Sequence, residues 1–263
     1  MTTTPPTSST AYQTTPVDYL TRIIQLFGEY KKRAYGFMNL QPGQSLLDAG
    51  CGTGDDLLGI YQAMQGKVQL AGVDLDSDTL AVARKRAESA GAKIDFQQAD
   101  LTSLPFADDQ FDIVRSDRVF QHLLDPMGVL KEMIRVTRPG GHVVAIDVDW
   151  GTLVLDHPQP EFTDQITAFA RDHHTNGRSG RQLHQWFQKA ELKEIEGYAD
   201  AVCVRDWEIA GYIWGLPALL QKMVAAGVAS QSDADSWLED AAAHADKGLF
   251  CSSMTGFVMR GRV

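Results

Sequence analysis

The feature that most constrains the fold is a regular alternation of apolar, strand-like runs with helix-like segments between positions 45 and 150. The helical segments include Asp55 to Gln65, Ser77 to Gly91 and Pro126 to Thr137. Such alternation predicts parallel strands joined by crossover helices, in a doubly wound α/β sheet with helices on both faces. The strand-like runs are SLLDAG (45–50), VQLAGVDL (68–75), KIDFQQAD (93–100), FDIVRSD (111–117) and HVVAIDVDW (142–150).

The segments outside this region divide the chain further. Residues 1–16 are rich in Thr, Ser and Pro, which predicts a disordered tail, and residues 17–263 are expected to form one domain. Within it we expect an N-terminal helical cover (17–40), a cofactor-binding core (41–150) and a lid with the last strands (151–263). The expected elements after position 150 are helices at 160–172, 180–190, 207–226 and 232–245 and a final strand at 251–261.

Composition excludes several classes of function. The net charge of −10 and the absence of a long basic run argue against a nucleic-acid partner. No apolar run reaches membrane-spanning length, and the N-terminus does not resemble a secretory signal, so we expect a cytoplasmic protein. The three cysteines lack metal-ligand spacing, and no metal site is predicted.

The motif DAGCGTG (Asp48 to Gly54) stands where the first strand passes into a helix. Its glycines Gly50, Gly52 and Gly54 allow a tight turn and a close approach of the backbone to a ligand. The dinucleotide pattern GxGxxG would need a glycine at position 55, which is Asp55. The motif therefore indicates a nucleotide-like ligand other than a dinucleotide.

Two carboxylates follow at the ends of the next strands. Asp74 ends the second strand, where a carboxylate can accept hydrogen bonds from both hydroxyls of a ribose. Asp100 ends the third strand and is placed either to accept from an adenine amino group or to cap a turn.

Together, LLDAGCGTG, GVDLD, ADLTSLPFADDQFDIV, FQHLLDP and RVTRPGGHVVAID resemble the class I S-adenosylmethionine-dependent methyltransferases of the ubiquinone/menaquinone-biosynthesis type. The resemblance implies a seven-stranded sheet whose last strand is antiparallel, with a helical lid. It implies that Asp48 and the glycine-rich loop border the cofactor, with Gly50, Gly52 and Asp74 around its methionine and ribose parts. It also places Leu75, Asp100 and Leu101 around adenine and Ser116 beside the sulfonium.

The catalytic candidates are two histidines. His122 follows the fourth strand and His157 lies just beyond the fifth, so both are expected near the ligand crevice. Each is either a base that accepts a substrate proton or a structural, hydrogen-bonded histidine. Gln121, beside His122, is expected to face cofactor or substrate.

The candidates for binding the acceptor are more scattered. Asp149 and Trp150 end the fifth strand, where they either meet the acceptor or form a strand-end cap and a core tryptophan. Trp214 belongs to an aromatic stretch that is either core or pocket wall. Tyr19 and Arg33 lie on the N-terminal helices, and Arg33 either meets the methionine carboxylate of the cofactor or lies on the surface.

The function predicted from these observations is transfer of a methyl group to an O, N or C atom of a small, partly apolar or aromatic metabolite. Two alternatives stay open: a protein of this fold that binds the cofactor but catalyses another reaction such as cyclisation, and a nucleotide-binding α/β enzyme. A homodimer is a further possibility that the sequence does not decide.

Overall fold

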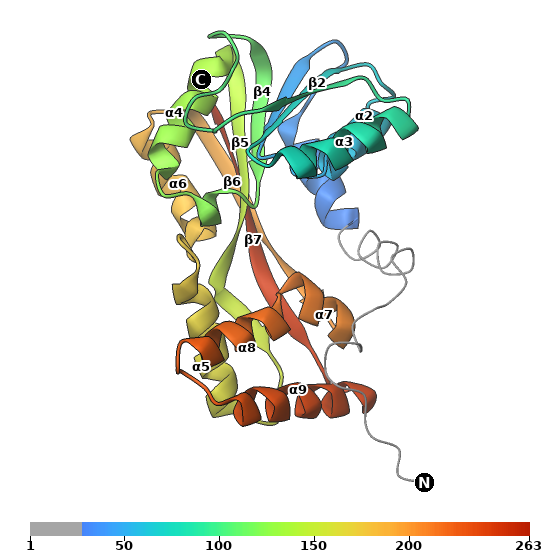
Figure 1. Ribbon diagram of the computed structural model, residues 1–263. Coiled ribbons are helices and arrows are strands. Elements are labelled where there is room, and N and C mark those ends of the chain that lie inside the picture. Colours follow the sequence, from blue (N-terminus) through green and yellow to red (C-terminus); the bar gives the residue numbers. More distant parts are fainter. Residues whose placement is uncertain (1–27) are drawn as a thin grey trace. The chain divides into compact units, whose positions relative to one another are not determined.

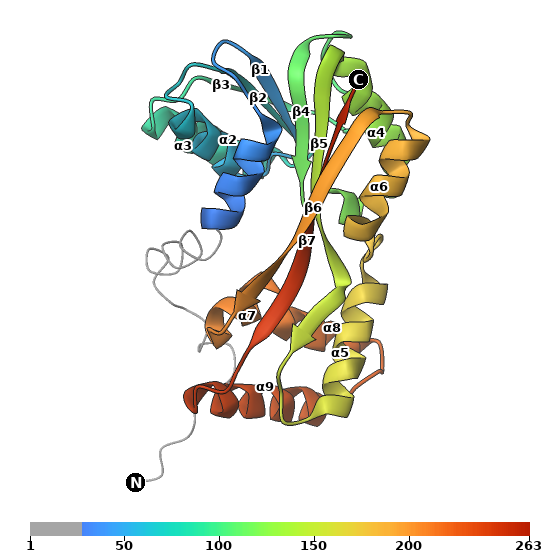
Figure 2. The same cartoon turned by 180° about the vertical axis from the view of Figure 1, so that it is seen from behind.

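The computed structural model describes residues 28–263, in which a seven-stranded sheet has the order β3-β2-β1-β4-β5-β7-β6 (Figure 1). The pairs β1–β2, β2–β3, β1–β4 and β4–β5 are parallel, and β7 runs opposite to β5 and β6 (Figure 2). This confirms the predicted doubly wound sheet with an antiparallel last strand. The strands are β1 (Ser45–Ala49), β2 (Gln69–Asp74), β3 (Ile94–Gln98), β4 (Phe111–Asp117), β5 (Thr137–Leu155), β6 (Lys193–Val204) and β7 (Ser252–Arg262).

The strand order reverses between β1 and β4, which pair side by side with Asp48 opposite Arg115. In open α/β sheets, ligands bind beyond the carboxyl ends of the strands at such a reversal. The topology therefore puts the candidate site where the glycine-rich loop leaves β1.

Contacts along the chain define two compact units, which we describe separately. The sheet unit comprises Arg33–Thr152, Arg171–Ala201 and Thr255–Val263, and the helical unit includes Leu153–Ala170 and Val202–Met254. Strands β5, β6 and β7 contribute residues to both units.

The sheet unit buries apolar residues between the strands and the helices on the two faces. Helices α2 (Asp55–Ala63) and α3 (Ser77–Ser89) cover one face, and α4 (Pro126–Val136) and α6 (Ser179–Lys189) cover the other (Figures 1 and 2). Asp76 caps α3 by accepting from the backbone N–H groups of Asp78 and Thr79, and Asp125 caps α4 in the same manner. These caps fix where both helices begin, directly after the loops that face the site.

The helical unit is formed by the first part of α5 (Pro160–His173) with α7 (Trp207–Ile213), α8 (Leu216–Ala225) and α9 (Gln231–Asp246). The fully buried Trp237 of α9 donates from Nε1 to Thr163 Oγ1 of α5 at 2.9 Å and packs edge-on against Trp207. The tryptophans Trp214 and Trp237 thus belong to the core of this unit, whereas Tyr212 is 69% exposed.

Two boundaries differ from the prediction. The prediction of a single helix at 207–226 is wrong. Two helices, α7 and α8, occupy this segment, because Gly215 adopts φ 62° and Pro217 lies in the first turn of the second helix. Strand β5 (Thr137–Leu155) extends beyond both ends of the predicted 142–150. Residues 138–141 bulge between the register pairs Phe111–Thr137 and Ile113–His142, and Asp149 and Trp150 lie within the strand and not at its end. The other predicted strands and helices from position 45 onward lie within a few residues of their expected bounds.

In the N-terminal region, residues 28–38 are helical, as expected. The predicted tail at 1–16 and the start of the helical cover lie outside the described residues. No helix within residues 28–263 is both long and apolar enough to cross a membrane.

Candidate functional site

The glycine-rich loop between β1 and α2 adopts the conformation its sequence requires. Gly50, Gly52 and Gly54 have φ values of 83°, 53° and 74°, in the left-handed region that favours glycine. A Cβ atom at Gly50 would meet Val119 Cγ2 at 2.5 Å, whereas one at Gly52 would meet nothing within 4 Å. The loop is thus packed at Gly50 and open at Gly52, where a ligand can approach the backbone.

The end of β2 meets this loop directly. Asp74 Oδ2 accepts a hydrogen bond from the Gly52 N–H at 2.8 Å, and Asp74 Oδ1 accepts from the Asp76 N–H. The next residue, Leu75, leaves 67% of its surface exposed. A carboxylate beside an open loop and an exposed apolar side chain fit the ribose and adenine contacts predicted for Asp74 and Leu75.

The turn after β3 carries the third predicted cofactor contact. Asp100 Oδ1 accepts from the backbone N–H of Thr102 at 2.8 Å and from its Oγ1 at 2.7 Å. These two hydrogen bonds lower the pKa of Asp100. Asp100 therefore caps its own turn, while Leu101 is partly buried against the apolar core of the sheet unit.

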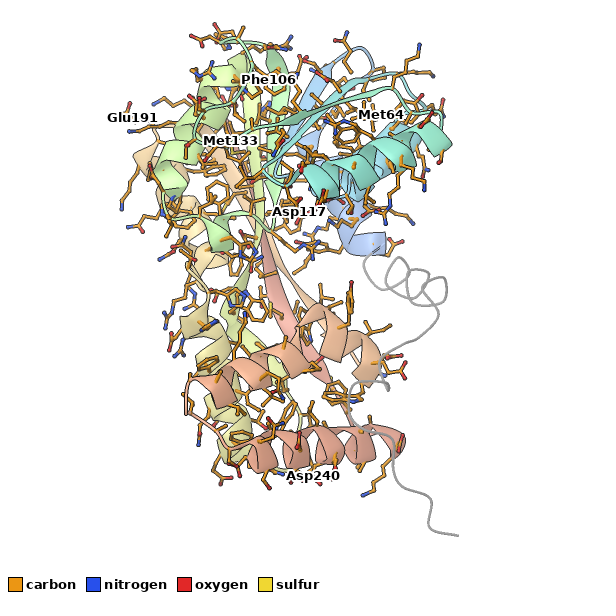
Figure 3. The ribbon with its side chains drawn as sticks, in the orientation of Figure 1. Met64, Phe106, Asp117, Met133, Glu191 and Asp240 are labelled. Carbon is orange, nitrogen blue, oxygen red and sulfur yellow. The ribbon has the colours of Figure 1, made fainter. Side chains whose placement is uncertain are left out.

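Below the glycine-rich loop lies a buried ionic cluster centred on Arg115 of β4. The guanidinium, with 0% of its side chain exposed, lies 3.2 Å from Asp48, 3.0 Å from Asp56 and 2.8 Å from Asp117. Figure 3 labels Asp117, the last residue of β4. Tyr35 Oη donates to Asp56 Oδ1 at 2.9 Å and so ties the N-terminal helix to the cluster. Although burial disfavours the charge, the three carboxylates raise the pKa of Arg115.

This cluster includes one residue predicted to border the cofactor. The carboxylate of Asp48 is buried and paired with Arg115, and its contact with the cofactor stays a prediction. Ser116, expected beside the sulfonium, is also fully buried, and its Oγ has no hydrogen-bond partner within residues 28–263.

A second buried network joins the residues after β4 to the middle of β5. Gln121 accepts from Trp150 Nε1 at 2.7 Å and donates from Nε2 to the Arg118 carbonyl, while its N–H donates to Asp147. Both ends of the Gln121 amide thus bind protein groups, and its contact with cofactor or substrate stays a prediction. Burial raises the pKa of Asp147 to about 7.

Three rings lie together beside this network. The rings of Trp150 and His174 stack with centroids 4.1 Å apart and planes 15° from parallel, and His122 lies 6.1 Å from His174. Burial and the neighbouring His174 lower the pKa of His122, which keeps its imidazole neutral near pH 7. His174 was missed by the sequence analysis, since it follows α5 in a segment without a recognisable motif.

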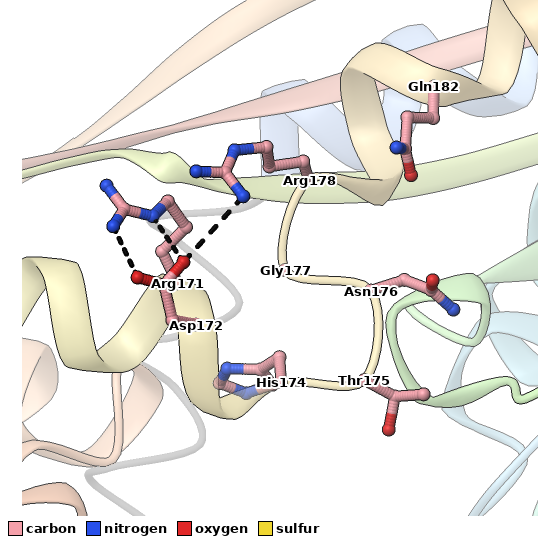
Figure 4. Close-up of a pocket in the computed structure, with 8 residues that line it drawn as sticks. All are labelled: Arg171, Asp172, His174, Thr175, Asn176, Gly177, Arg178 and Gln182. Atoms are coloured by element: carbon pink, nitrogen blue, oxygen red, sulfur yellow. Dashed lines mark hydrogen bonds and ion pairs between the residues drawn. The ribbon is translucent and has the colours of Figure 1, made fainter.

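A pocket opens in the segment between α5 and α6 (Figure 4). At its rim Arg171 and Arg178 both pair with Asp172. Asn176 fixes this segment to the short helix η1 (Phe120–His122), donating from Nδ2 to the Phe120 carbonyl at 3.1 Å and from its N–H to the Gln121 carbonyl. The lining residues are Arg171, Asp172, His174, Thr175, Asn176, Gly177, Arg178 and Gln182.

The structure gives protein partners to two candidates of the sheet unit for which two roles were left open. Asp149, a candidate for acceptor binding, is fully buried, pairs with Arg181 and accepts from the Gly151 N–H, which favours the structural role. Arg33, a candidate for the methionine carboxylate of the cofactor, pairs with Asp200 at 2.5 Å, and its guanidinium lies 3.9 Å from the centroid of the Tyr198 ring. Tyr19 lies outside the described residues.

Two further candidates belong to the core of the helical unit. His157 is buried and stacks on Trp237, Nδ1 accepts from the Gln159 N–H, and Nε2 lies 3.0 Å from the Trp237 carbonyl. Both of its nitrogens are thus engaged with the backbone, which favours a structural role over the predicted role as a base. Trp214 is buried too, and its Nε1 donates to Ser252 Oγ.

Comparison with known proteins gives a consistent result. The family described as "Methyltransferase domain" matches residues 40–200. The chain is 33% identical over 237 residues to an uncharacterised 37.1 kDa protein in transposon TN4556 of Streptomyces fradiae, covering 88% of this chain and 66% of that protein. It is 34% identical over 126 residues to demethylmenaquinone methyltransferase of Staphylococcus epidermidis, covering 48% of this chain and 52% of the relative.

Among solved structures, the YcgJ protein of Bacillus subtilis superposes with a TM-score of 0.60 at 22% identity, over 90% of this chain and 97% of that one. At this level of identity the likeness concerns the fold. The matched sequence region contains β1 to β5, and with them the glycine-rich loop and Asp74.

Proposed function

Because the chain belongs to the class I S-adenosylmethionine-dependent methyltransferases, we propose that it transfers the methyl group of S-adenosylmethionine to a small, partly apolar or aromatic metabolite. The observation that carries the proposal is the contact between Asp74 and the Gly52 N–H beside the exposed Leu75. This arrangement presents a carboxylate, open backbone and an apolar surface at the reversal of the strand order.

The residues of this chain fit the cofactor on three counts. Gly52 has no side chain, and the space where one would project is open. Asp74 would accept from the ribose hydroxyls, and Leu75 would pack on the adenine. When bound, S-adenosylmethionine supplies a methyl carbon already activated by a positive sulfur, so the protein chiefly has to align the acceptor and exclude water.

The cofactor half of the proposal is tested by isothermal titration of the full chain with S-adenosylmethionine, S-adenosylhomocysteine and NAD. We expect micromolar binding of the two adenosyl compounds, about 10- to 100-fold weaker in Asp74→Ala because a charge-assisted hydrogen bond is lost. The matched control is Asp95→Ala, which removes an exposed carboxylate of the neighbouring strand β3. A preference for NAD, or equal losses in both variants, would contradict the proposal.

The acceptor half is supported by the rings near the carboxyl end of β4 and the middle of β5. Trp150, His174 and His122 lie together beside the polar pocket of Figure 4, so aromatic and polar groups adjoin in the sheet unit. The name of the Staphylococcus relative, a demethylmenaquinone methyltransferase, supports a small-molecule acceptor, and the net charge of −10 disfavours a nucleic acid.

The reaction itself is tested with S-adenosylmethionine labelled in its methyl group and a panel of phenols, quinols and amines. Label in the acceptor together with S-adenosylhomocysteine establishes transfer. Tight cofactor binding with an acceptor that is converted but unlabelled would favour the non-methylating alternative.

We further propose that His122 accepts the proton when the acceptor atom carries one. Its side chain is exposed, its imidazole is neutral near pH 7, and it lies on η1, which follows β4. His122→Gln should lower kcat by about 10²- to 10⁴-fold and remove the acidic limb of the pH profile. His142→Gln, at a histidine whose pKa is likewise lowered by burial, is the control. Similar small effects of both substitutions would exclude His122 as a base.

A further inference from the structure

The helical unit contains two thiols in direct contact. Cys203 is the second-to-last residue of β6, and Cys251 lies immediately before β7. Their Sγ atoms are 3.4 Å apart. Cys203 is exposed and Cys251 is partly exposed. Solvent and small reagents therefore reach this pair, whereas the third cysteine, Cys51, is a buried residue of the glycine-rich loop.

Hydrogen bonds hold the chain on both sides of the pair. Ser252 Oγ donates to the Val204 carbonyl at 3.0 Å, which joins the residues next to the two cysteines. The Cys251 carbonyl accepts from the Asp156 N–H at 2.8 Å. The two thiols are thus held together by their neighbours, and a disulfide, with sulfurs about 2.05 Å apart, needs them to approach by only about 1.4 Å.

We propose that Cys203 and Cys251 form a reversible disulfide by exchange with a low-molecular-weight disulfide such as oxidised glutathione. The Cys203 thiolate attacks a sulfur of the reagent, which gives a mixed disulfide and releases one glutathione thiolate. The Cys251 thiolate then attacks Cys203 Sγ and releases the second. The two protein thiols lose two electrons and two protons in total, and one oxidised glutathione becomes two reduced molecules.

The disulfide would close the segment that contains α7, α8 and α9, since the two cysteines are 48 positions apart in the sequence. A cross-link of this span restricts the unfolded chain and therefore stabilises the folded helical unit. This inference concerns a modification site and does not depend on methyl transfer, so the outcomes for the two proposals are separable.

The test treats the full chain with oxidised glutathione, blocks the remaining thiols with an alkylating reagent under denaturing conditions and determines the masses of intact protein and peptides. Wild type should lose two hydrogens, carry one blocked thiol at Cys51 and yield a peptide that links Cys203 to Cys251. Its Tm should rise by several degrees and return to the starting value after reduction with dithiothreitol.

The single variants separate the two chemical steps. Cys251→Ser should stop at the mixed disulfide and retain one glutathione on Cys203, with no rise in Tm. Cys51→Ser should behave as wild type, because Cys51 takes no part. Wild type that keeps both thiols at Cys203 and Cys251, or that accumulates the glutathione adduct as stably as Cys251→Ser does, would overturn the proposal.

Discussion

Arg115 and Asp48, paired across neighbouring strands with Nη1 and Oδ2 3.2 Å apart, form a buried ion pair directly beneath the glycine-rich loop. Asp56 and Asp117 contact the same guanidinium, and Asp117 also lies 3.8 Å from Arg118 while Asp56 accepts from Tyr35 Oη. Desolvated charges need such compensation, and the loss of Arg115 removes the fully buried cation of this group. The loop therefore depends on Arg115 for its support.

We expect Arg115→Met to lower the free energy of unfolding by about 3–5 kcal/mol, because it removes the buried cation that contacts three carboxylates. Urea denaturation measures the loss. Adding Asp48→Asn in the same chain should recover part of it, since one of the buried negative charges is removed.

The control for this substitution is Arg262→Met, which removes an arginine that pairs with Glu194 and is 40% exposed. Such pairs contribute at most about 1 kcal/mol. Equal losses for Arg115→Met and Arg262→Met would show that the cluster does not support the fold.

Leu75 and Leu124 are both exposed leucines, with 67% and 94% of their surface accessible, but only Leu75 follows Asp74 at the end of β2. If Leu75 packs on the adenine, Leu75→Ala should raise the Kd for S-adenosylmethionine about 5- to 10-fold, because apolar contact is lost. Leu124→Ala should leave the Kd unchanged. Titration calorimetry compares them, and an unchanged Kd for Leu75→Ala would remove Leu75 from the adenine site.

Alanine substitutions at Gly52 and Gly43 distinguish the effect of backbone strain from the effect of a lost ligand contact. Both have positive φ, 53° and 91°, and a Cβ at either position would meet nothing within 4 Å. Alanine at either should cost about 1–2 kcal/mol of stability because a left-handed conformation is strained with a side chain. Only Gly52→Ala should also weaken S-adenosylmethionine binding. Equal affinities for the two variants would argue against a ligand at Gly52.

The parts of this protein that the sequence predicts well are those determined by nearby residues. The apolar runs of β1, β2 and β4 are sufficient to identify buried strands. The glycines after β1 predict a tight turn, because glycine readily adopts the positive φ values that such a turn needs. The split between α7 and α8 was missed because the apolar spacing continues across Gly215.

The polar side chains whose roles the sequence leaves open have protein partners that are remote in the sequence. Gln121 binds Trp150 at a separation of 29 positions, Asp149 binds Arg181 at 32 and Arg33 binds Asp200 at 167. The residues that neighbour a polar side chain in the sequence do not indicate whether its hydrogen-bond partner is a protein group or a ligand. Only the tertiary fold decides between these two roles.

Asp147, in the buried network with Gln121 and Trp150, makes a contribution to the free energy of unfolding that depends on pH. Burial raises its pKa to about 7 in the folded state, above the value near 3.9 of an unfolded chain. The folded state therefore binds more protons between about pH 4 and pH 7, and the contribution of Asp147 to stability is lost as the pH rises through this range. We expect the unfolding free energy of wild type, relative to Asp147→Asn, to be larger at about pH 5 than at about pH 8. Urea denaturation at both pH values tests this, with the exposed Asp95→Asn as the control; a difference that stays constant or increases with pH would contradict the burial of an ionisable Asp147.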